Sequence, residues 1–497
     1  MFAERSILFT KVGNTPQMFG IVQEFKSVCP QVRVLGITDA DKNSPHVFDE
    51  AVASSDQLLL GDYEHSTLTR DHIPPNIFSE IEPEIHHLLR LADRVYAYDL
   101  NLVVGDRPLG SIFPDSYNAR LNLVLRHLIF WYSVLENRNV SAVVFPNLPH
   151  GIWDASLMSL ARARKIPCMH FHEVPPFIGS LYMYEKPGDI GNLHFGQMLL
   201  DEARRKYGLV PDSSNRLEKL RQGVSGDLAA RLPSGISRRP MSVRIANILE
   251  LLLKEKFGHR LKRRVTQNLS YQRSLRSERK LHYQGEIQQG CYFHELQLPG
   301  NATTLVKGRS FPRQLDMIRH IAEAIPDDKL LFIRESPRFH ARKLTRPSGF
   351  WTEIARIPNV RVVGQQLGLE KISDMVGIVV ELGYSSLALH HLKQGKVVVF
   401  LGATHLGRIG KTVFNSEFQS LSKAFSVAER ILSDSYDARR ITNDLENQYL
   451  EVLRSTIEGV LSWYPDNAID DLDYQRRLHT NVGRVLATWF SRFSEAK

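Results

Sequence analysis

Short runs of β-branched and aromatic residues alternate with longer stretches of helical apolar spacing through the first half of the chain. Six of the short runs are interpreted as strands, at residues 6–12, 32–38, 57–60, 94–98, 142–145 and 167–171. Between residues 113 and 138 the apolar positions repeat with the period of an α-helix. Strands that alternate with helices are typical of a parallel sheet with crossover helices. We therefore predict one open α/β domain over residues 1–235.

A second alternation of the same kind begins at Gly290. Its expected strands are residues 290–296, 329–334, 360–363, 377–382 and 396–401, and its expected helices are residues 314–324, 369–375 and 385–393. This pattern predicts a second doubly wound α/β domain over residues 286–420. Only helical patterns follow, including residues 475–493, so we expect residues 421–497 to form a helical tail that packs across the lobes. A chain of 497 residues is also too long for one core, since cores stop growing near roughly 250–300 residues.

The connection between the two alternations, residues 236–285, is basic and helix-prone. From 238 to 280 it holds 13 Lys/Arg and 3 Asp/Glu, a local charge of +10, which accounts for the +9 of the whole chain. Apolar residues from Ile245 to Leu261 lie among these cations, which suits a helix on the anionic inner surface of a membrane. A solvated helix that joins the lobes fits the same residues. Binding of nucleic acid is not favoured, because the segment lacks the interleaved aromatic residues of single-strand binders.

Composition narrows the setting in which the protein works. The longest strongly apolar stretch, residues 128–135, is far shorter than the ~20 residues that span a bilayer. The N-terminus carries an acidic residue and a short apolar run that suits a first strand better than a secretion signal. The three cysteines lie far apart without a CxxC spacing, which indicates neither a disulfide framework nor a zinc site. We expect a cytoplasmic protein.

Residues that directly follow a strand are the first candidates for function, because open α/β sheets bind ligands outside the carboxyl ends of their strands. His150 stands in such a place, in Phe145-Pro-Asn-Leu-Pro-His150-Gly, after the strand expected at 142–145. A histidine there can act as a general base or bind a phosphate or a sugar hydroxyl, because its pKa lies near working pH. A histidine that caps a helix or closes a turn fits equally well.

Positive charge gathers after the strand expected at 329–334. The loop reads Arg334-Glu335-Ser336-Pro337-Arg338, and it is followed by Arg342, Lys343 and Arg346. Cations beside a helix N-terminus favour a diphosphate or a phosphodiester, so we predict that this loop binds an anion. The alternative is a solvated basic loop.

Two further turns follow expected strands. In Glu381-Leu-Gly383-Tyr-Ser385-Ser386 a serine would cap the next helix and offer hydroxyl and backbone N–H groups to phosphate oxygens. Capping alone explains these serines equally well. The turn at residues 402–407 holds two glycines, which permit a ligand to approach the backbone closely.

These pieces together resemble the capsule polysaccharide biosynthesis glycosyltransferases, chiefly their C-terminal half. The stretches that carry the resemblance are Cys291-Tyr-Phe-His-Glu-Leu-Gln-Leu-Pro-Gly-Asn-Ala-Thr-Thr304, Phe311-Pro-Arg-Gln-Leu-Asp-Met-Ile318, Leu331-Phe-Ile-Arg-Glu-Ser-Pro337, Gly395-Lys-Val-Val-Val-Phe-Leu-Gly402 and the turn Pro149-His150. They fall within about residues 140–200 and 288–402. The resemblance implies a GT-B type of fold, with two Rossmann-like lobes of which the second holds a nucleotide-sugar donor.

Three positions depart from the family pattern. The family typically has Lys-Glu-His-Pro where this chain has Arg-Glu-Ser-Pro, so Ser336 replaces the histidine expected to contact the donor phosphate. Asn301 stands where a glutamate usually precedes the Thr-Thr pair, and His390 and His391 stand where Glu-Ala usually precedes the Gly-Lys. The departures leave open a different donor preference, or a lobe that binds without catalysis.

The resemblance implies transfer of a sugar from a nucleotide-sugar donor to a glycan or lipid-linked glycan acceptor of capsular or surface polysaccharide. Such chemistry needs cations and N–H dipoles at the leaving phosphate and a base at the acceptor hydroxyl. His150 is the candidate base, with Glu173 as the alternative. The donor-binding candidates are Arg334, Ser336, Pro337, Arg338, Gly383, Ser385, Ser386 and His390. Neither a metal nor another cofactor is implied.

Two other functions fit the same residues. One is a nucleotide-sugar epimerase on the same two-lobed scaffold, because one fold hosts many activities. The other is a non-catalytic relative that scaffolds polysaccharide assembly.

Overall fold

Two units of α/β structure make up the computed structural model. Unit 1 consists of residues 1–218 and 448–497, and unit 2 consists of residues 219–447. The chain returns to unit 1 within a helix, α16 (Ala438–Ser455). The residues that the structure describes are 5–12, 16–38, 48–54, 57–58, 73–98, 103–104, 107–108, 117–146, 149, 151–173, 180–185, 193–209, 257–285, 290–298, 311, 313–341, 344–347, 349–383, 385–402, 410–434, 438–455, 457–458 and 472–494.

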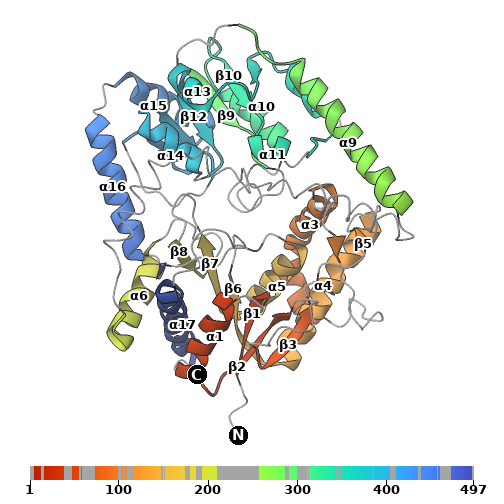
Figure 1. The fold of residues 1–497 in the computed structure, drawn as a ribbon, viewed down its shortest axis with the longest axis vertical. Helices are drawn as coiled ribbons and strands as arrows, with labels where there is room; N and C mark the ends of the chain where they lie inside the picture. Colours follow the sequence, from red (N-terminus) through yellow and green to blue (C-terminus); the bar gives the residue numbers. More distant parts are fainter. Residues whose placement is uncertain are drawn as a thin grey trace. The chain divides into compact units, whose positions relative to one another are not determined.

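The sheet of unit 1 has seven strands in the order β15-β8-β7-β6-β1-β2-β3 (Figure 1). They are β1 (Ser6–Val12), β2 (Arg33–Thr38), β3 (Glu50–Ser54), β6 (Val140–Phe145), β7 (Cys168–Glu173), β8 (Ser180–Tyr184) and β15 (Ile457–Glu458). The first three and β6 and β7 pair in parallel, whereas β8 and β15 form antiparallel pairs at one edge. A separate antiparallel pair consists of β4 (Val103–Val104) and β5 (Arg107–Pro108).

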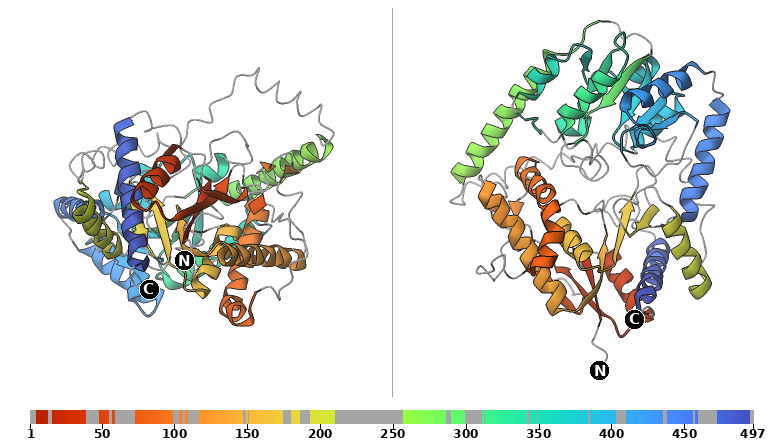
Figure 2. Two further views of the ribbon diagram at one scale, coloured as in Figure 1. Left: turned by 90° about the horizontal axis from the view of Figure 1, so that it is seen from below. Right: turned by 180° about the vertical axis from the view of Figure 1, so that it is seen from behind.

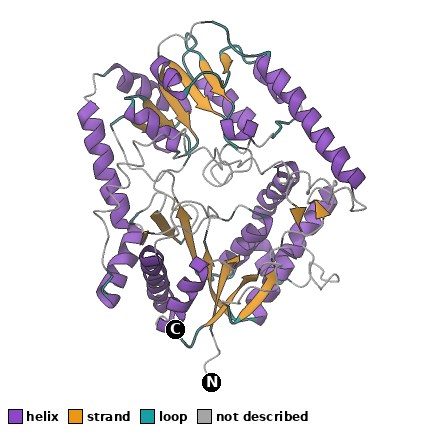
Figure 3. Ribbon diagram, viewed as in Figure 1, coloured by secondary structure: helices purple, strands orange, loops and turns teal. Residues whose placement is uncertain are grey.

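Helices cover both faces of this sheet (Figure 3). On one face, α1 (Pro16–Val28), α6 (His194–Tyr207) and α17 (Leu472–Ser494) share a core with the strands. On the other, α4 (Tyr117–Asn137) and α5 (Ile152–Ala163) contact β6 and β7, and α3 (Pro75–Tyr98) packs against both helices. The C-terminal helix lies beside α1 (Figure 2), where the ring of Phe490 meets Phe25 edge-on at 5.9 Å between centroids. This last helix is therefore part of the core of unit 1.

The sheet of unit 2 has six strands in the order β11-β10-β9-β12-β13-β14, and every neighbouring pair is parallel. They are β9 (Cys291–Glu295), β10 (Leu331–Arg334), β11 (Val360–Val363), β12 (Val376–Glu381), β13 (Val397–Phe400) and β14 (Thr412–Phe414). All residues of β10, β12 and β13 are buried. Near-continuous apolar runs of this kind are expected for parallel strands that are covered on both faces.

Helices also cover both faces of the second sheet. On one face, α10 (Gln314–Ala324), α12 (Phe350–Ala355) and α15 (Leu421–Ser433) contribute to a single core. On the opposite face, α13 (Leu369–Met375) and α14 (Ser386–Lys393) contact β12 and β13. The short helix α11 (Pro337–Ala341) follows β10, and a 3₁₀ turn, η5 (Asn415–Glu417), follows β14. Helices on both faces of two sheets confirm the predicted fold class of two doubly wound α/β lobes.

Several strand predictions were wrong, and local chemistry explains them. The strand expected at 57–60 lies instead at β3, and Gln57 and Leu58 are helical. Ser54 and Gln57 exchange hydrogen bonds, with Ser54 N donating to Gln57 Oε1 at 2.8 Å and Gln57 N to Ser54 Oγ at 3.2 Å. This is a capping box, which starts a helix.

The strand expected at 94–98 is the end of α3, since packing against α4 and α5 outweighs the β-propensity of a few residues. Five short strands were not predicted, namely β4, β5, β8, β14 and β15. The last of them also interrupts the tail that was expected to be wholly helical.

The basic connection contains α9 (Phe257–Arg279), which belongs to unit 2 and packs on α12. Tyr271 and Glu278 are buried, and Ser274 Oγ accepts a hydrogen bond from Trp351 Nε1 at 3.3 Å. The cations of this segment whose side chains are described are exposed, namely Arg273, Arg276, Arg279 and Lys280. Residues 236–256 lie outside the described residues, and with them the apolar positions before Phe257. Within the described part of the chain, no helix is both long and apolar enough to cross a membrane.

Candidate functional site

The strand order of unit 2 creates a topological switch point. The chain builds from β9 toward β11 on one side of the sheet and from β12 toward β14 on the other. The connections therefore leave the carboxyl ends of β9 and β12 in opposite directions, and open α/β sheets bind ligands outside such a pair of ends. We call the side chains gathered there the strand-end site, which comprises Glu295, Arg334, Glu335, Ser336, Glu381 and Ser385.

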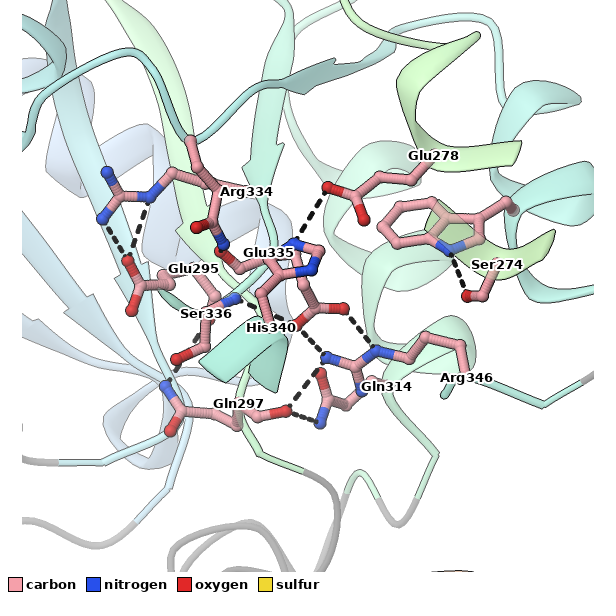
Figure 4. A network of polar contacts seen from close by, with 12 residues as sticks. Ser274, Glu278, Glu295, Gln297, Gln314, Arg334, Glu335, Ser336, His340 and Arg346 are labelled. Carbon is pink, nitrogen blue, oxygen red and sulfur yellow. Dashed lines mark hydrogen bonds and ion pairs between the residues drawn. The ribbon is translucent and has the colours of Figure 1, made fainter. Parts of the chain in front are cut away.

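Arg334, the last residue of β10, is buried and paired. It lies in register with Glu295, the last residue of β9. Its Nε donates to Glu295 Oε2 at 3.1 Å, and its Nη2 bonds to the same oxygen (Figure 4). Its Nη1 donates to Leu367 O at 3.3 Å. Only 5% of Arg334 is exposed. Its charge is therefore balanced within the sheet, and it holds the carboxyl ends of two strands together.

Glu335 and Arg346 form a second pair beside the first. Arg346 donates from Nε to Glu335 Oε2 at 2.7 Å and from Nη2 to Oε1 at 2.6 Å, and both side chains are almost fully buried. Ser336 N also donates to Glu335 Oε1, at 2.9 Å. Burial raises the pKa of Glu335, while the charge and hydrogen bonds of Arg346 lower it. The alternative of a solvated loop is therefore wrong for Arg346, which braces the turn after β10.

The rest of this loop is short and compact. Ser336 is buried, with 8% exposed, and Pro337 opens α11 in the position where its missing N–H costs least. Arg338 lies in α11, but its side chain is outside the described residues, as are Arg342 and Lys343. Anion binding by this loop stays a prediction.

Ser385 is the N-cap of α14. Its Oγ accepts a hydrogen bond from Ala388 N at 3.0 Å, and its φ and ψ of −138° and 161° are extended. Gly383 in the preceding turn is buried, and Ser386 begins the helix, with a side chain outside the described residues. The N-terminus of α14 thus points its free N–H groups toward the carboxyl end of β12, where an anion would be stabilised.

The two histidines of α14 have different surroundings. His391 is fully buried, its Nδ1 lies 2.8 Å from Ser373 Oγ, and burial lowers its pKa to about 3. His390 is partly buried, and burial also lowers its pKa, although Glu370 acts in the opposite direction. Both rings are therefore neutral near pH 7. His390, in the position where the family has glutamate, stays a predicted donor contact.

The two candidate bases of unit 1 are only partly located. Glu173 ends β7, but its side chain lies outside the described residues. His150 lies outside them altogether, as do Asn301 and residues 403–409 of the glycine-containing turn. Their roles stay predictions.

Glu381, the last residue of β12, was quoted in the sequence but was not predicted to act. It is fully buried, and neither carboxyl oxygen forms a hydrogen bond with a described residue. Burial raises its pKa well above the usual value, the Glu295 carboxylate raises it further, and the Ser385 hydroxyl lowers it. That hydroxyl is near, but it does not meet the geometry of a hydrogen bond with Glu381. An acidic residue that ends an apolar strand, as in Val-Gly-Ile-Val-Val-Glu381, was the available signal.

Among the described residues, no group of three or more His, Cys, Asp or Glu side chains is placed to hold a metal ion.

Comparison with known proteins gives distant likenesses. No family model and no curated protein matches this sequence. Among solved structures, the calicheamicin glycosyltransferase CalG4 is 12% identical, with 92% of this chain and 95% of that chain covered and a TM-score of 0.24. The UDP-GlcNAc 2-epimerase of Methanocaldococcus jannaschii, in complex with UDP-GlcNAc and UDP, is 11% identical, with 90% and 99% covered and a TM-score of 0.24. Alr3699/HepE of Anabaena, in complex with UDP and glucose, is 10% identical, with 91% and 95% covered and a TM-score of 0.26. The fold class rests on the strand order and strand direction of the two sheets.

Proposed function

We propose that the protein is a glycosyltransferase that takes a sugar from a nucleotide-sugar donor held at the strand-end site of unit 2. The observation that carries this proposal is the strand order of unit 2, which sets buried charged side chains and the N-terminus of α14 at one switch point. The resemblance of residues 288–402 to capsule polysaccharide glycosyltransferases supports the same function. The proposed acceptor is a capsular or surface glycan, free or lipid-linked, in the cytoplasm.

The proposed chemistry is displacement of the nucleotide from the sugar. Negative charge develops on the leaving phosphate, and preorganised N–H dipoles stabilise it. The N-terminus of α14, with Ser385 and Ser386, would supply such dipoles, and Arg338 would supply a cation. Arg334 would act indirectly, because its guanidinium is already bound by Glu295 and Leu367 O.

The acceptor hydroxyl needs a base, and His150 is the proposed one, with Glu173 as the alternative. General base catalysis contributes roughly 10²–10⁴-fold to a rate. We expect His150→Ala to lower transfer at least a hundredfold while UDP binding by unit 2 is unchanged. The measurement is product formation with donor and acceptor, beside Glu173→Gln. If Glu173→Gln alone stops transfer, the base is Glu173.

A screen with UDP, CDP, CMP and GDP tests the donor site. A ligand that binds only the folded state raises the melting temperature, so at least one nucleotide should do so. If none does, the donor site is disproved. Conversion of a nucleotide sugar without any acceptor would indicate an epimerase instead. Binding without turnover, in the presence of the acceptor, would indicate a scaffolding protein.

The exposed cations of α9 suit a contact with an anionic membrane. Arg273, Arg276, Arg279 and Lys280 face away from the side that packs on unit 2. Each basic residue near an anionic bilayer contributes about 1 kcal/mol. Co-sedimentation with phosphatidylserine vesicles should therefore fall when all four are changed to glutamine. Equal binding to neutral phosphatidylcholine vesicles would contradict this contact.

A further inference from the structure

Glu381 has an unusual position among the charged residues of unit 2. As the last residue of β12 it lies beside β9 and β13, in register with Phe400 on the β13 side. Its side chain is completely covered, and neither of its carboxyl oxygens has a hydrogen-bond partner among the described residues. A buried carboxylate without a partner is costly, so such a group either binds a proton or serves a ligand.

The arginine at the strand ends, Arg334, is already paired. Arg334 on β10 gives two hydrogen bonds to Glu295 and a third to Leu367 O, and the ring of Phe293 lies 5.8 Å from its guanidinium carbon. The strand ends therefore hold two carboxyl groups and one arginine, and the arginine belongs to Glu295. Among the residues that the structure describes, the other carboxyl group, that of Glu381, has no counterion.

No described element beside Glu381 supplies a cation to it. Glu295 on β9 is a like charge, and Phe400 on β13 is apolar. On α14, His391 is neutral because burial lowers its pKa to about 3. Ser385, at the start of the same helix, is the one described group that favours the ionised form of Glu381.

Ser385 also links Glu381 to the N-terminus of α14, where a phosphate is proposed to bind. Its Oγ accepts from Ala388 N, which leaves its own O–H free to donate in one direction. An ionised Glu381 would attract that O–H and place a negative charge beside the N-terminus of α14. A protonated Glu381 does neither, so the O–H and the helix N–H groups stay available to a phosphate.

We propose that Glu381 is a positioning residue that is kept neutral, so that the Ser385 hydroxyl and the N-terminus of α14 can bind the phosphate of the nucleotide. This inference rests on the proposed function and adds a proton-linked control of its donor site. Glu381 itself does not need to touch the ligand, which agrees with its complete burial.

Infrared difference spectroscopy of the parent protein and Glu381→Gln tests the protonation directly. Glutamine has the same shape and no charge. The parent should show the carbonyl stretch of a protonated carboxylic acid at pH 7, and Glu381→Gln should lack it. An ionised carboxylate at pH 7 overturns the proposal.

Titration calorimetry with UDP tests the consequence, over the pH range in which that infrared band disappears. The affinity of the parent should fall by up to about tenfold for each pH unit above the pKa of Glu381. Glu381→Gln should lack this fall, while any titration of UDP itself affects both proteins equally. Equal decline in the two proteins overturns the proposal.

The same experiment separates this inference from the function on which it rests. If the parent protein binds none of UDP, CDP, CMP and GDP at any pH, the donor site fails, and the role of Glu381 in it fails as well. If the parent binds UDP and Glu381→Gln shows the same pH profile, only the role of Glu381 fails. Glu381→Met provides a second neutral side chain in case the amide does not fold, and it should also lack the pH-dependent fall.

Discussion

Glu335, directly after β10, and Glu381, at the end of β12, are two completely buried carboxyl groups of unit 2. They differ in their hydrogen-bond partners and in the charges beside them. Glu335 receives two hydrogen bonds from its own arginine, Arg346, and a third from Ser336 N. Glu381 receives none from a described residue and faces a second carboxylate. Burial raises the pKa of both groups, but among the described residues a cation opposes this rise only at Glu335.

The difference teaches how a structural charge can be told from a functional one. A buried ion pair is costly to break, because removal of one partner leaves the other uncompensated. A buried acid that has no partner stabilises nothing in the free protein, so its presence calls for another reason. Glu335 and Arg346 therefore hold the turn after β10, whereas for Glu381 we have proposed a role in nucleotide binding.

Glu335→Met should cause the largest change in stability. It leaves Arg346 as a buried cation without its partner, which typically costs about 3–5 kcal/mol. Urea denaturation at pH 7 measures the free energy of unfolding. Arg319→Met is the control, because Arg319 and Glu353 form a half-exposed pair of a kind worth about 0–1 kcal/mol. Equal losses of stability in the two variants would show that the buried Glu335–Arg346 pair contributes no more than a half-exposed pair.

His170→Phe extends the comparison to unit 1. The ring of His170 stacks between Phe145 and Tyr184, its two nitrogens have no partner among the described residues, and burial lowers its pKa to about 3. The pKa of His170 is lower in the folded protein than in the unfolded chain. Its burial therefore does not reduce the free energy of unfolding above about pH 6.5, but reduces it progressively as the pH falls toward 3.

At pH 4.5 this linkage amounts to about 2–3 kcal/mol. Phenylalanine cannot bind the proton, so His170→Phe should be more stable than the parent by that amount at pH 4.5, relative to their difference at pH 8. Urea denaturation at the two pH values is the measurement. The same difference at both would show that His170 is not buried neutral.

Glu381→Met should change stability in the direction opposite to Glu335→Met. It removes a buried polar group that has no hydrogen-bond partner among the described residues, and burial of such a group costs about 1–3 kcal/mol. The raised pKa of Glu381 means that its ionised form is disfavoured in the folded state. The parent protein therefore loses stability as the pH rises above the pKa of a glutamate in the unfolded chain, about 4.3. The gain in the free energy of unfolding should therefore be larger at pH 7 than at pH 4. A loss at pH 7 would assign Glu381 a structural partner.

The sequence was sufficient to predict both doubly wound sheets, because buried strands such as β10 and β12 can be recognised from the apolar residues within the strand itself. It also directed the search for a site to the connections after the strands, where ligands of such sheets bind, and the roles of the residues there stay predictions. It could not show which charges are paired. Arg334 and Arg346 read as two cations of one loop, but their partners are Glu295, which is 39 residues away from Arg334, and Glu335, which is 11 residues away from Arg346. Pairing of this kind depends on strand register and loop path, which no local pattern encodes.

The smallest effect separates capping from binding. Ser385 and Ser420 are both N-caps in unit 2, and each accepts a hydrogen bond from a backbone N–H three residues on, of Ala388 at 3.0 Å and of Lys423 at 3.3 Å. Replacement of either by alanine should lower the free energy of unfolding by about 1 kcal/mol. Only Ser385 lies at the switch point, so Ser385→Ala alone should weaken UDP binding, while Ser420→Ala leaves it unchanged. Urea denaturation and titration calorimetry measure the two quantities on the same samples. If both variants bind UDP like the parent, Ser385 acts only as a helix cap. Protonation of Glu381 could then not affect nucleotide binding through the Ser385 hydroxyl.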